Sequence, residues 1–316
     1  MEKELKYLVI GAGGTGGPIG GFLAKAGKDV SLIARGRHLE AMKTCGLEIE
    51  LGEDSFLIPV KAYTMEEYQD APDVIFVCVK GYSLEEGADF IRKIAAPHTV
   101  VVPILNIYGT GGMLQKMLPQ LTVTDGCIYI ASQIKEPGKI LMSGKIFRVV
   151  FGLRKGTSGE ETEKVKPILE KIEEDLKGAG ILPELSSNIE KDALQKFSFV
   201  SPMAAVGAGF QVMAEAMQEG GEYRETFIAL IREIQKIASA MGIELPKNIV
   251  EINKKIMDDL APEASSSMQR DIDANKQSEV DGLIYQVVRL GEKYKVEVPW
   301  YKEIEERLRK RLGEQA

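Results

Sequence analysis

The feature that most constrains the fold is a run of small residues, Gly11-Ala12-Gly13-Gly14-Thr15-Gly16, directly after the apolar segment Leu5–Ile10. The apolar segment is typical of a short buried strand, and the small residues after the run predict a helix. A strand, a glycine turn and a helix in this order form the phosphate-binding turn of dinucleotide-binding domains. In such turns the first glycine permits the sharp bend, the second lets a pyrophosphate approach, and the third allows close helix–strand packing.

The predicted second strand, Asp29–Ala34, indicates which nicotinamide cofactor is used. NAD-binding domains usually carry an Asp or Glu here that accepts from the ribose 2′-hydroxyl. This strand is followed instead by Arg35-Gly36-Arg37. The planar guanidinium of Arg35 is suited to pair with a 2′-phosphate, so the sequence favours NADP(H). The predicted cofactor residues are Gly11, Ala12, Gly13, Gly14, Thr15, Gly16 and Arg35, and a contribution from Arg37 stays open.

Strands and helices alternate through the first half of the chain, whereas the second half is almost entirely helical in its apolar spacing. We therefore predict an α/β protein with an N-terminal Rossmann-type doubly wound sheet and a C-terminal all-helical domain. Residues 126–152 predict an antiparallel pair that closes the sheet. The loop-rich stretch 178–187 places the boundary between an NADP-binding domain, residues 1–186, and a helical substrate and catalytic domain, residues 187–316.

Composition excludes several other classes of protein. The net charge is −7 without a basic stripe, which argues against nucleic-acid binding. No apolar run approaches the roughly 20 residues of a membrane span, and no signal segment is visible, so we expect a cytoplasmic protein. The three cysteines form no C-x-x-C pair, and the two histidines have no metal-ligand neighbours, so no metal site is predicted. The apolar helix faces are compatible with a homodimer or with a core inside one chain.

Along nearly its whole length the chain resembles the ketopantoate reductases (2-dehydropantoate 2-reductases). The shared segments, besides the glycine turn, are Val77–Lys80, Leu105-Asn106, Gln195–Phe197 and Ser267–Asp281. The serine–glutamate spacing within the last segment is the most specific of these features. The resemblance implies an NADP-dependent oxidoreductase of pantothenate biosynthesis that reduces the ketone of a 2-oxo acid, first of all 2-dehydropantoate.

The resemblance also implies roles for individual residues. Lys196 would be the general acid, and its apolar neighbours would lower its pKa toward the working pH. Glu279 would accept from the substrate hydroxyl, orient Lys196 and border the cofactor. The remaining implied residues bind substrate or cofactor: Asn106, Ser267 and Lys80. Two of these have simpler alternatives, since Lys80 is equally typical of a solvated strand end and Ser267 of a helix cap.

The chain departs from the family pattern beside the predicted general acid. The family generally carries asparagines four and eight residues after the catalytic lysine, whereas this chain has Val200 and Ala204. Pro202, between them, predicts a break in the helix. Because loss of two amides changes hydrogen bonding to a polar substrate, the reductase chemistry is expected to persist, and a less polar 2-oxo acid is an alternative substrate.

Two other functions stay open at this point. One is a different NADP-dependent dehydrogenase of the same plan, acting in the oxidative or opine-forming direction. The other is an NADP-binding sensor without turnover, although such a protein has no need of a proton donor at Lys196.

Overall fold

The computed structural model of the chain describes residues 4–314, apart from the side chain of Lys145. The chain divides into two compact units. The first comprises the residues up to Leu105 together with Gly109–Asp192, and the second comprises Asn106–Tyr108 and the residues from Ala193 onward. The division thus falls inside helix α6 (Ile189–Phe210), after the predicted boundary, and gives the three-residue segment 106–108 to the second unit.

A six-stranded, fully parallel sheet forms the centre of the first unit. Its strands are β1 (Lys6–Ile10), β2 (Asp29–Ile33), β5 (Lys61–Tyr63), β6 (Val74–Val77), β7 (Val100–Pro103) and β8 (Thr122–Val123). They lie in the order β5-β2-β1-β6-β7-β8. This is the doubly wound order 3-2-1-4-5-6, in which the order of strand addition reverses between β1 and β6 although all strands stay parallel. The predicted Rossmann-type sheet is confirmed.

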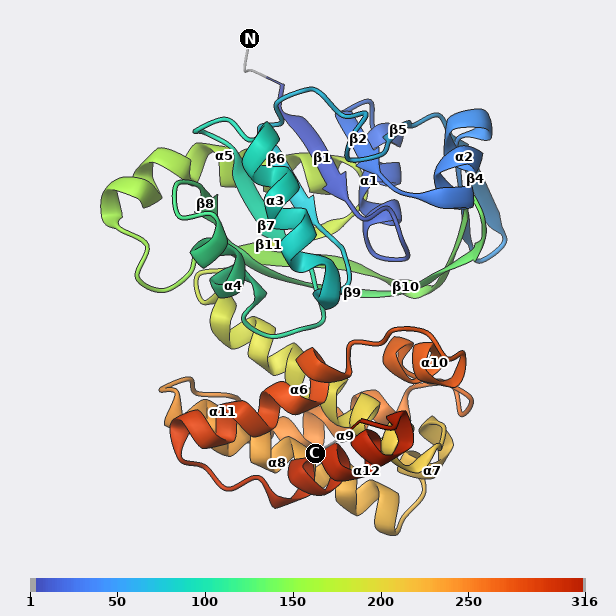
Figure 1. The fold of residues 1–316 in the computed structure, drawn as a ribbon, viewed down its shortest axis with the longest axis vertical. Coiled ribbons are helices and arrows are strands. Elements are labelled where there is room, and N and C mark those ends of the chain that lie inside the picture. Colours follow the sequence, from blue (N-terminus) through green and yellow to red (C-terminus); the bar gives the residue numbers. More distant parts are fainter. Residues whose placement is uncertain (1–3, 315–316) are drawn as a thin grey trace. The chain divides into compact units, whose positions relative to one another are not determined.

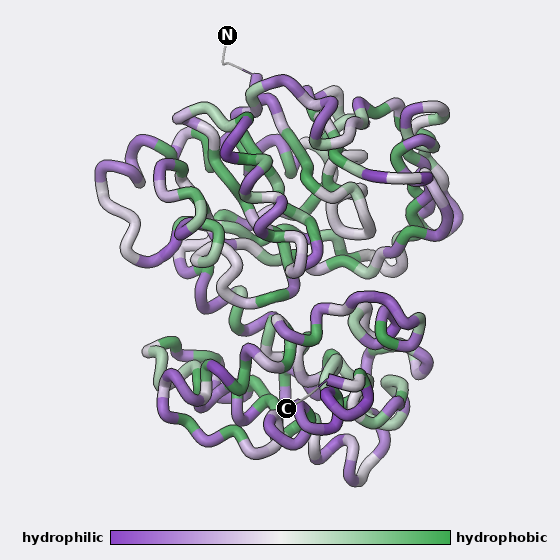
Figure 2. The backbone as a smooth tube through the Cα atoms, in the orientation of Figure 1, coloured by the Kyte–Doolittle hydropathy of each residue, from purple (hydrophilic) through white to green (hydrophobic). Residues whose placement is uncertain are grey.

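Helices cover both faces of this sheet because alternate strand residues point to opposite sides. Leu8 and Ile10 of β1 belong to the core under α3 (Leu84–Ile94) and α4 (Thr110–Met117). Tyr7 and Val9 belong to the core shared with α1 (Gly16–Lys25) and α5 (Gly159–Gly178). The central strands β1, β6 and β7 are mainly hydrophobic in Figure 2, as expected for strands buried on both faces.

The antiparallel pair predicted for residues 126–152 is present, but the prediction that it closes the parallel sheet is wrong. Instead it belongs to a second, five-stranded sheet (Figure 1). The strands of this sheet are β3 (Leu47–Leu51), β4 (Asp54–Ile58), β9 (Asp125–Glu136), β10 (Lys139–Gly152) and β11 (Leu182–Leu185). The inner residues Ile140 and Phe151 of β10 join the core under α1 and α5, so burial of apolar surface draws the pair away from the sheet edge. Strand β11 occupies the stretch predicted as boundary loop.

The second unit is helical, as predicted, in the part that the structure describes. Its helices are α6, α7 (Ala214–Gln218), α8 (Glu222–Ala240), α9 (Ile249–Asp258), α10 (Ser267–Asp273), η2 (Asp281–Tyr285), α11 (Gln286–Tyr294) and α12 (Pro299–Leu312). Their apolar faces form one buried core within the chain. Within residues 4–314, no helix combines the length and the apolar character that a membrane crossing requires.

The predicted helix break at Pro202 is wrong, because α6 continues through it. Proline has no N–H group, so the carbonyl four residues earlier, at Ser198, loses its usual helical partner. The side chain of Asn253, on α9, supplies the missing donor: its Nδ2 lies 2.9 Å from the Ser198 carbonyl oxygen and 3.0 Å from the Ser198 hydroxyl. A tertiary hydrogen bond therefore replaces the lost backbone bond.

Candidate active site

The glycine turn at the end of β1 is built by close backbone packing. Gly11 has a φ of +94°, and a side chain there would begin 2.8 Å from the carbonyl oxygen of Cys78, just after β6. Gly16 lies so close to β1 that its Cβ would be 2.7 Å from a methyl of Val9. A Cβ at Gly13, in contrast, would meet nothing within 4 Å among the residues that the structure describes. The space beside Gly13 is thus left open by the fold.

The turn also presents unused donors at the beginning of α1. Among residues 4–314, the backbone N–H groups of Gly13, Gly14 and Thr15 have no hydrogen-bond partner. They lie at a helix N-terminus, where the dipole favours an anion. Open space, free N–H groups and a helix N-terminus are what a pyrophosphate requires, so these residues fit the predicted dinucleotide.

Two side chains that sequence reasoning did not single out fix this turn. His38, on α2 (Gly36–Cys45), contacts the Ala12 carbonyl oxygen through Nε2 at 2.9 Å and accepts from the Gly138 N–H through Nδ1 at 2.9 Å. The acceptor role of Nδ1 requires the proton on Nε2, which then donates to Ala12. Burial lowers the pKa of His38 below its ordinary value. The hydroxyl of Ser132, on β9, donates to the Gly14 carbonyl.

Arg35 lies directly after β2, one strand away from the glycine turn in the sheet, and its side chain is exposed. The side chains of Arg35 and Arg37 make no hydrogen bond or ion pair with another residue of the described range. Ala34 occupies the position directly after β2, where an acidic side chain would repel a 2′-phosphate. The end of β2 therefore offers an uncompensated positive charge.

Lys80 follows β6, the strand beside β1, and precedes the short helix η1 (Gly81–Ser83). Its side chain is half-buried. The carboxyl ends of neighbouring parallel strands meet at one edge of the sheet. Lys80, Arg35 and the glycine turn therefore lie along the same edge of the first unit, where open α/β sheets bind their ligands.

In the second unit the structure brings two of the predicted residues into direct contact. The Lys196 Nζ donates to the Asn106 Oδ1 across 2.7 Å. This bond fixes the orientation of the amide, because the oxygen is engaged by an ammonium donor. The Asn106 Nδ2 has no partner among residues 4–314. The pair thus presents an ammonium group and an amide donor side by side.

Glu279 also belongs to the second unit, and its side chain is only 6% exposed. It immediately precedes Val280 and the turn η2, which is π-helical. Glu279 therefore directly precedes the helical segment and does not belong to it. Its backbone carbonyl accepts from the Leu283 N–H at 3.0 Å, so Glu279 occupies the N-cap position, where a carboxylate also favours the helix dipole.

Ser267 is the first residue of α10 and does not cap this helix. The cap is Ser266, whose side chain accepts from the N–H of Gln269 at 3.1 Å. Of the two departures from the family pattern, Ala204 is fully buried in the helical core, whereas Val200 is half-buried on its margin. Ala204 thus contributes to packing, and Val200 is the departure that keeps an accessible apolar surface one turn after Lys196.

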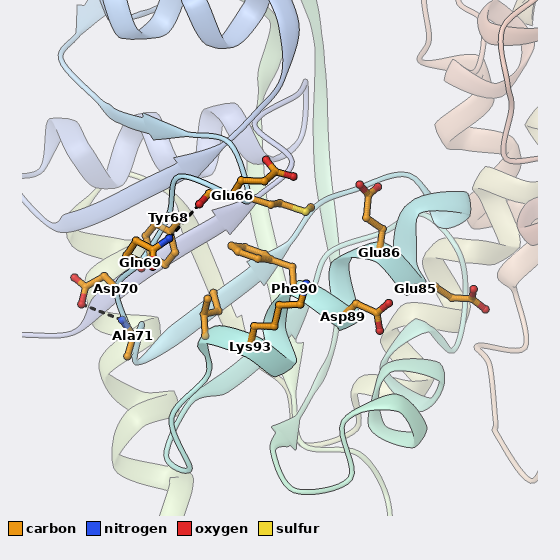
Figure 3. Close-up of a pocket in the computed structure, with 12 residues that line it drawn as sticks. Glu66, Tyr68, Gln69, Asp70, Ala71, Glu85, Glu86, Asp89, Phe90 and Lys93 are labelled. Atoms are coloured by element: carbon orange, nitrogen blue, oxygen red, sulfur yellow. Dashed lines mark hydrogen bonds between the residues drawn. The ribbon is translucent and has the colours of Figure 1, made fainter.

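A pocket of about 790 Å³ lies elsewhere on the first unit, between residues 65–71 and α3. Figure 3 shows acidic side chains from both of its walls. They are Glu66, Asp70, Glu85, Glu86 and Asp89. None of the predicted site residues lines this pocket. Because carboxylates repel a dinucleotide or an oxo acid, this pocket is not the candidate active site.

Comparisons with known proteins identify the family of the chain. Residues 7–156 match the family described as ketopantoate reductase PanE/ApbA, and residues 188–311 match its C-terminal family. A 2-dehydropantoate 2-reductase of Mesorhizobium japonicum is 30% identical over 311 residues, which cover 91% of each chain. An uncharacterized oxidoreductase of Bacillus subtilis, YkpB, is 30% identical over 281 residues, covering 88% of this chain and 89% of the relative.

Solved structures show the same fold. D-mandelate dehydrogenase with NADH and anilino(oxo)acetate superposes with a TM-score of 0.87 at 21% identity, covering 97% of this chain and 98% of that one. The matched segments span both units and include the glycine turn and the helix of Lys196. The chain belongs to the ketopantoate reductase family, whose members are oxidoreductases acting on a CH–OH group.

Proposed function

We propose that the protein reduces the ketone of a small 2-oxo acid with NADPH, and that 2-dehydropantoate is the first substrate to test. The observation that carries this proposal is the 2.7 Å hydrogen bond from Lys196 to Asn106. It joins the two residues for which the family resemblance implies substrate chemistry, although they are 90 positions apart in the chain. Family membership supports the reaction class, and the residues present support the role of each group.

Lys196 supplies the proton. Bound NADPH would supply the hydride for the carbonyl carbon. The former C=O oxygen then gains negative charge and takes a proton from the Lys196 ammonium, which yields the alcohol and a neutral amine. Solvent returns the proton to the amine. Before transfer, the same positive charge stabilises the developing alkoxide.

Asn106 and Glu279 orient the reacting groups. The bond from Lys196 holds the Asn106 amide with its Nδ2 as an available donor, suited to a carbonyl, carboxylate or ribose oxygen. Glu279, buried in the same unit, would accept from the substrate hydroxyl. Ser267, at the beginning of α10, is retained as a substrate-binding candidate because its hydroxyl is not needed for capping.

The first unit would hold the cofactor. The glycine turn Gly11–Gly16 would bind the pyrophosphate through free N–H groups, and Arg35 would pair with the 2′-phosphate. Lys80, at the neighbouring strand end, would complete this positive edge. The uncompensated charge of Arg35, together with the absence of an acid at the strand end, favours NADPH over NADH.

Val200 favours a second candidate within the same reaction class. Its half-buried apolar side chain lies one helical turn after Lys196, where the family has an amide. A substrate with a hydrophobic side chain would gain from contact with this surface, by about 0.8 kcal/mol for each buried methylene. A 2-oxo acid with a branched aliphatic or an aromatic side chain is therefore the alternative to 2-dehydropantoate.

The test is NADPH oxidation with 2-dehydropantoate and a panel of aliphatic and aromatic 2-oxo acids. Lys196→Ala should lower kcat by a factor of about 10² to 10⁴, as expected for loss of a general acid, while NADPH affinity stays unchanged. Lys191→Ala, on the same helix, is the matched control and should retain full activity. Turnover that survives Lys196→Ala would refute the assignment of the proton donor. Activity confined to apolar 2-oxo acids would replace 2-dehydropantoate with the second candidate.

A further inference from the structure

The turn that follows Glu279 has an unusual backbone. Residues Asp281–Tyr285 form a π-helical turn, η2, before the chain continues as α11. Its first bonds tie it to the backbone of Glu279, since the Leu283 N–H donates to the Glu279 carbonyl oxygen at 3.0 Å. Single π-helical turns have poorer hydrogen-bond geometry than α-helix and occur frequently at functional sites. Such a turn needs support from neighbouring segments.

The support comes from the two segments that carry the other predicted site residues. The Ser201 hydroxyl, on the helix of Lys196, donates to the Leu283 carbonyl oxygen at 2.6 Å. The Gln286 Nε2 donates to the Tyr108 carbonyl oxygen at 2.8 Å. Ile107 packs directly against the turn, since a Cβ on Gly282 would be 2.7 Å from the Ile107 Cγ1 and would force this side chain to shift.

These contacts explain why residues 106–108 belong to the second unit although the flanking chain belongs to the first. Ile107 packs in the helical core, and the turn η2 holds the segment from the other side. Asn106, Lys196 and Glu279 therefore come from three separate parts of the chain that meet around one turn.

A chain of buried polar groups extends this support into the core. Tyr301, on α12, contacts the Ser201 hydroxyl with its own hydroxyl at 2.6 Å. Because Ser201 donates its proton to Leu283, Tyr301 is the donor in this contact. The N–H groups of Trp300 and Tyr301 donate in turn to the Glu233 carboxylate, at 2.9 and 3.0 Å. Glu233 is buried, with 3% of its surface exposed, so the start of α12 is anchored.

We propose that Ser201 and Tyr301 are positioning residues for the reduction, because their hydroxyl groups hold the π-helical turn, and with it Glu279, against the helix that carries Lys196. This inference rests on the proposed function of Glu279 and Lys196. In this proposal neither hydroxyl group touches substrate or cofactor. Their effect on catalysis passes through the placement of Glu279, since a displacement of about 1 Å at a reacting group can cost a factor of 10² in rate.

The experiment is a double-mutant cycle between Ser201→Ala and Glu279→Gln. Alanine is the best helix former, so Ser201→Ala is expected to fold. It should lower kcat about tenfold without changing NADPH affinity. In the Glu279→Gln background the same substitution should lower kcat less than about twofold, because the carboxylate that it misplaces is already absent. Tyr301→Phe should lower kcat about threefold and have no further effect after Ser201→Ala.

Thr226→Val is the matched control. Thr226 is a buried residue of α8 in the same unit, and its hydroxyl has no partner in the described part of the chain. Removal of this hydroxyl should leave kcat unchanged. If Ser201→Ala leaves kcat at the wild-type value, or lowers it equally with and without the Glu279 carboxylate, the positioning role is refuted. If Glu279→Gln itself retains full turnover, the proposed function of Glu279 fails instead.

Amide hydrogen exchange gives a second readout that needs no substrate. Ser201→Ala should speed exchange at residues 282–286 at least about tenfold relative to wild type, because the turn loses a tertiary hydrogen bond. Thr226→Val should not change exchange there. Unchanged exchange in Ser201→Ala would overturn the proposal even if no 2-oxo acid of the panel is turned over.

Discussion

The two units build their candidate sites from different parts of the polypeptide. In the first unit the candidate site is made of backbone: Gly11 and Gly16 allow close packing, unpaired N–H groups of the described chain lie at the start of α1, and a Cβ at Gly13 would enter open space. In the second unit the candidate site is made of side chains: Lys196 donates to Asn106, and the Ser201 hydroxyl donates to the turn that follows Glu279. A backbone site depends on conformation at a few positions, whereas a side-chain site depends on contacts between distant residues.

The largest effect is expected at Gly11, where the packed backbone leaves no room for a side chain. Gly11→Ala places a side chain at a φ of +94° and 2.8 Å from the Cys78 carbonyl. We expect it to lower the free energy of unfolding by about 3 kcal/mol, measured by urea denaturation. Gly13→Ala is the matched change, because its Cβ meets no protein atom.

Gly13→Ala should retain stability to within about 0.5 kcal/mol but weaken NADPH binding at least tenfold, by roughly 1.4 kcal/mol. The contrast between the two glycines separates a role in folding from a role in binding. Equal NADPH affinity in Gly13→Ala and wild type would show that the space beside Gly13 is not occupied by the pyrophosphate.

Cofactor choice gives the next effect. Arg35→Gln should weaken NADPH binding by a factor of about 10 to 100, because a charge-assisted hydrogen bond to a phosphate contributes roughly 1.5–3 kcal/mol. NADH binding, measured by the same fluorescence titration, should change less than about twofold. Arg37→Gln serves as the neighbouring comparison and decides whether the second arginine takes part. Equal weakening for both cofactors would contradict the assignment of Arg35.

The helical unit is tested through the hydrogen bond from Asn253 that replaces the backbone bond lost at Pro202. Asn253→Ala leaves the buried Ser198 carbonyl without a donor and should lower the free energy of unfolding by about 1–3 kcal/mol. Pro202→Ala restores a backbone N–H at the position that α6 needs. The cost of Asn253→Ala should therefore be smaller in the Pro202→Ala background. If the two effects are simply additive, Asn253 does not compensate for the proline.

Sequence reasoning succeeded where the determining contacts are local. The glycine turn, the parallel strands and the position of Arg35 follow from neighbouring residues. The error over the antiparallel pair arose because alternation identifies strands but not their partners, and β10 pairs with β3, nearly one hundred residues earlier. The helix break at Pro202 was wrongly predicted for the same reason, since the amide that supports α6 comes from Asn253.

The candidate site shows the same limit. The resemblance to a family pointed to Lys196, Asn106 and Glu279, and the structure joins the first two. No local signal marked Ser201, which acts on a carbonyl 82 positions away, or His38, which bridges Ala12 and Gly138. Supporting residues of this kind become visible only when the tertiary contacts are known.

The smallest effect is expected at His38, whose side chain contacts the backbone carbonyl of Ala12 in the glycine turn. Burial places the pKa of His38 below its ordinary value of 6.5 in the folded protein. Above pH 6.5 the ring is neutral in both states, so its contribution to stability is fully present. As the pH falls through 6.5, the unfolded chain takes up a proton that the folded chain resists, and stability is lost.

His38→Gln keeps a donor near the Ala12 carbonyl but cannot be protonated. Between pH 7.5 and 5.5, wild type should lose about 2–4 °C more in Tm than this variant, the shift expected from one hydrogen bond of about 1 kcal/mol in a chain of this size. Carboxylates elsewhere affect both proteins alike and cancel in the comparison. Parallel Tm curves would mean that the imidazole only fills space, and that the glycine turn holds its conformation by backbone packing alone.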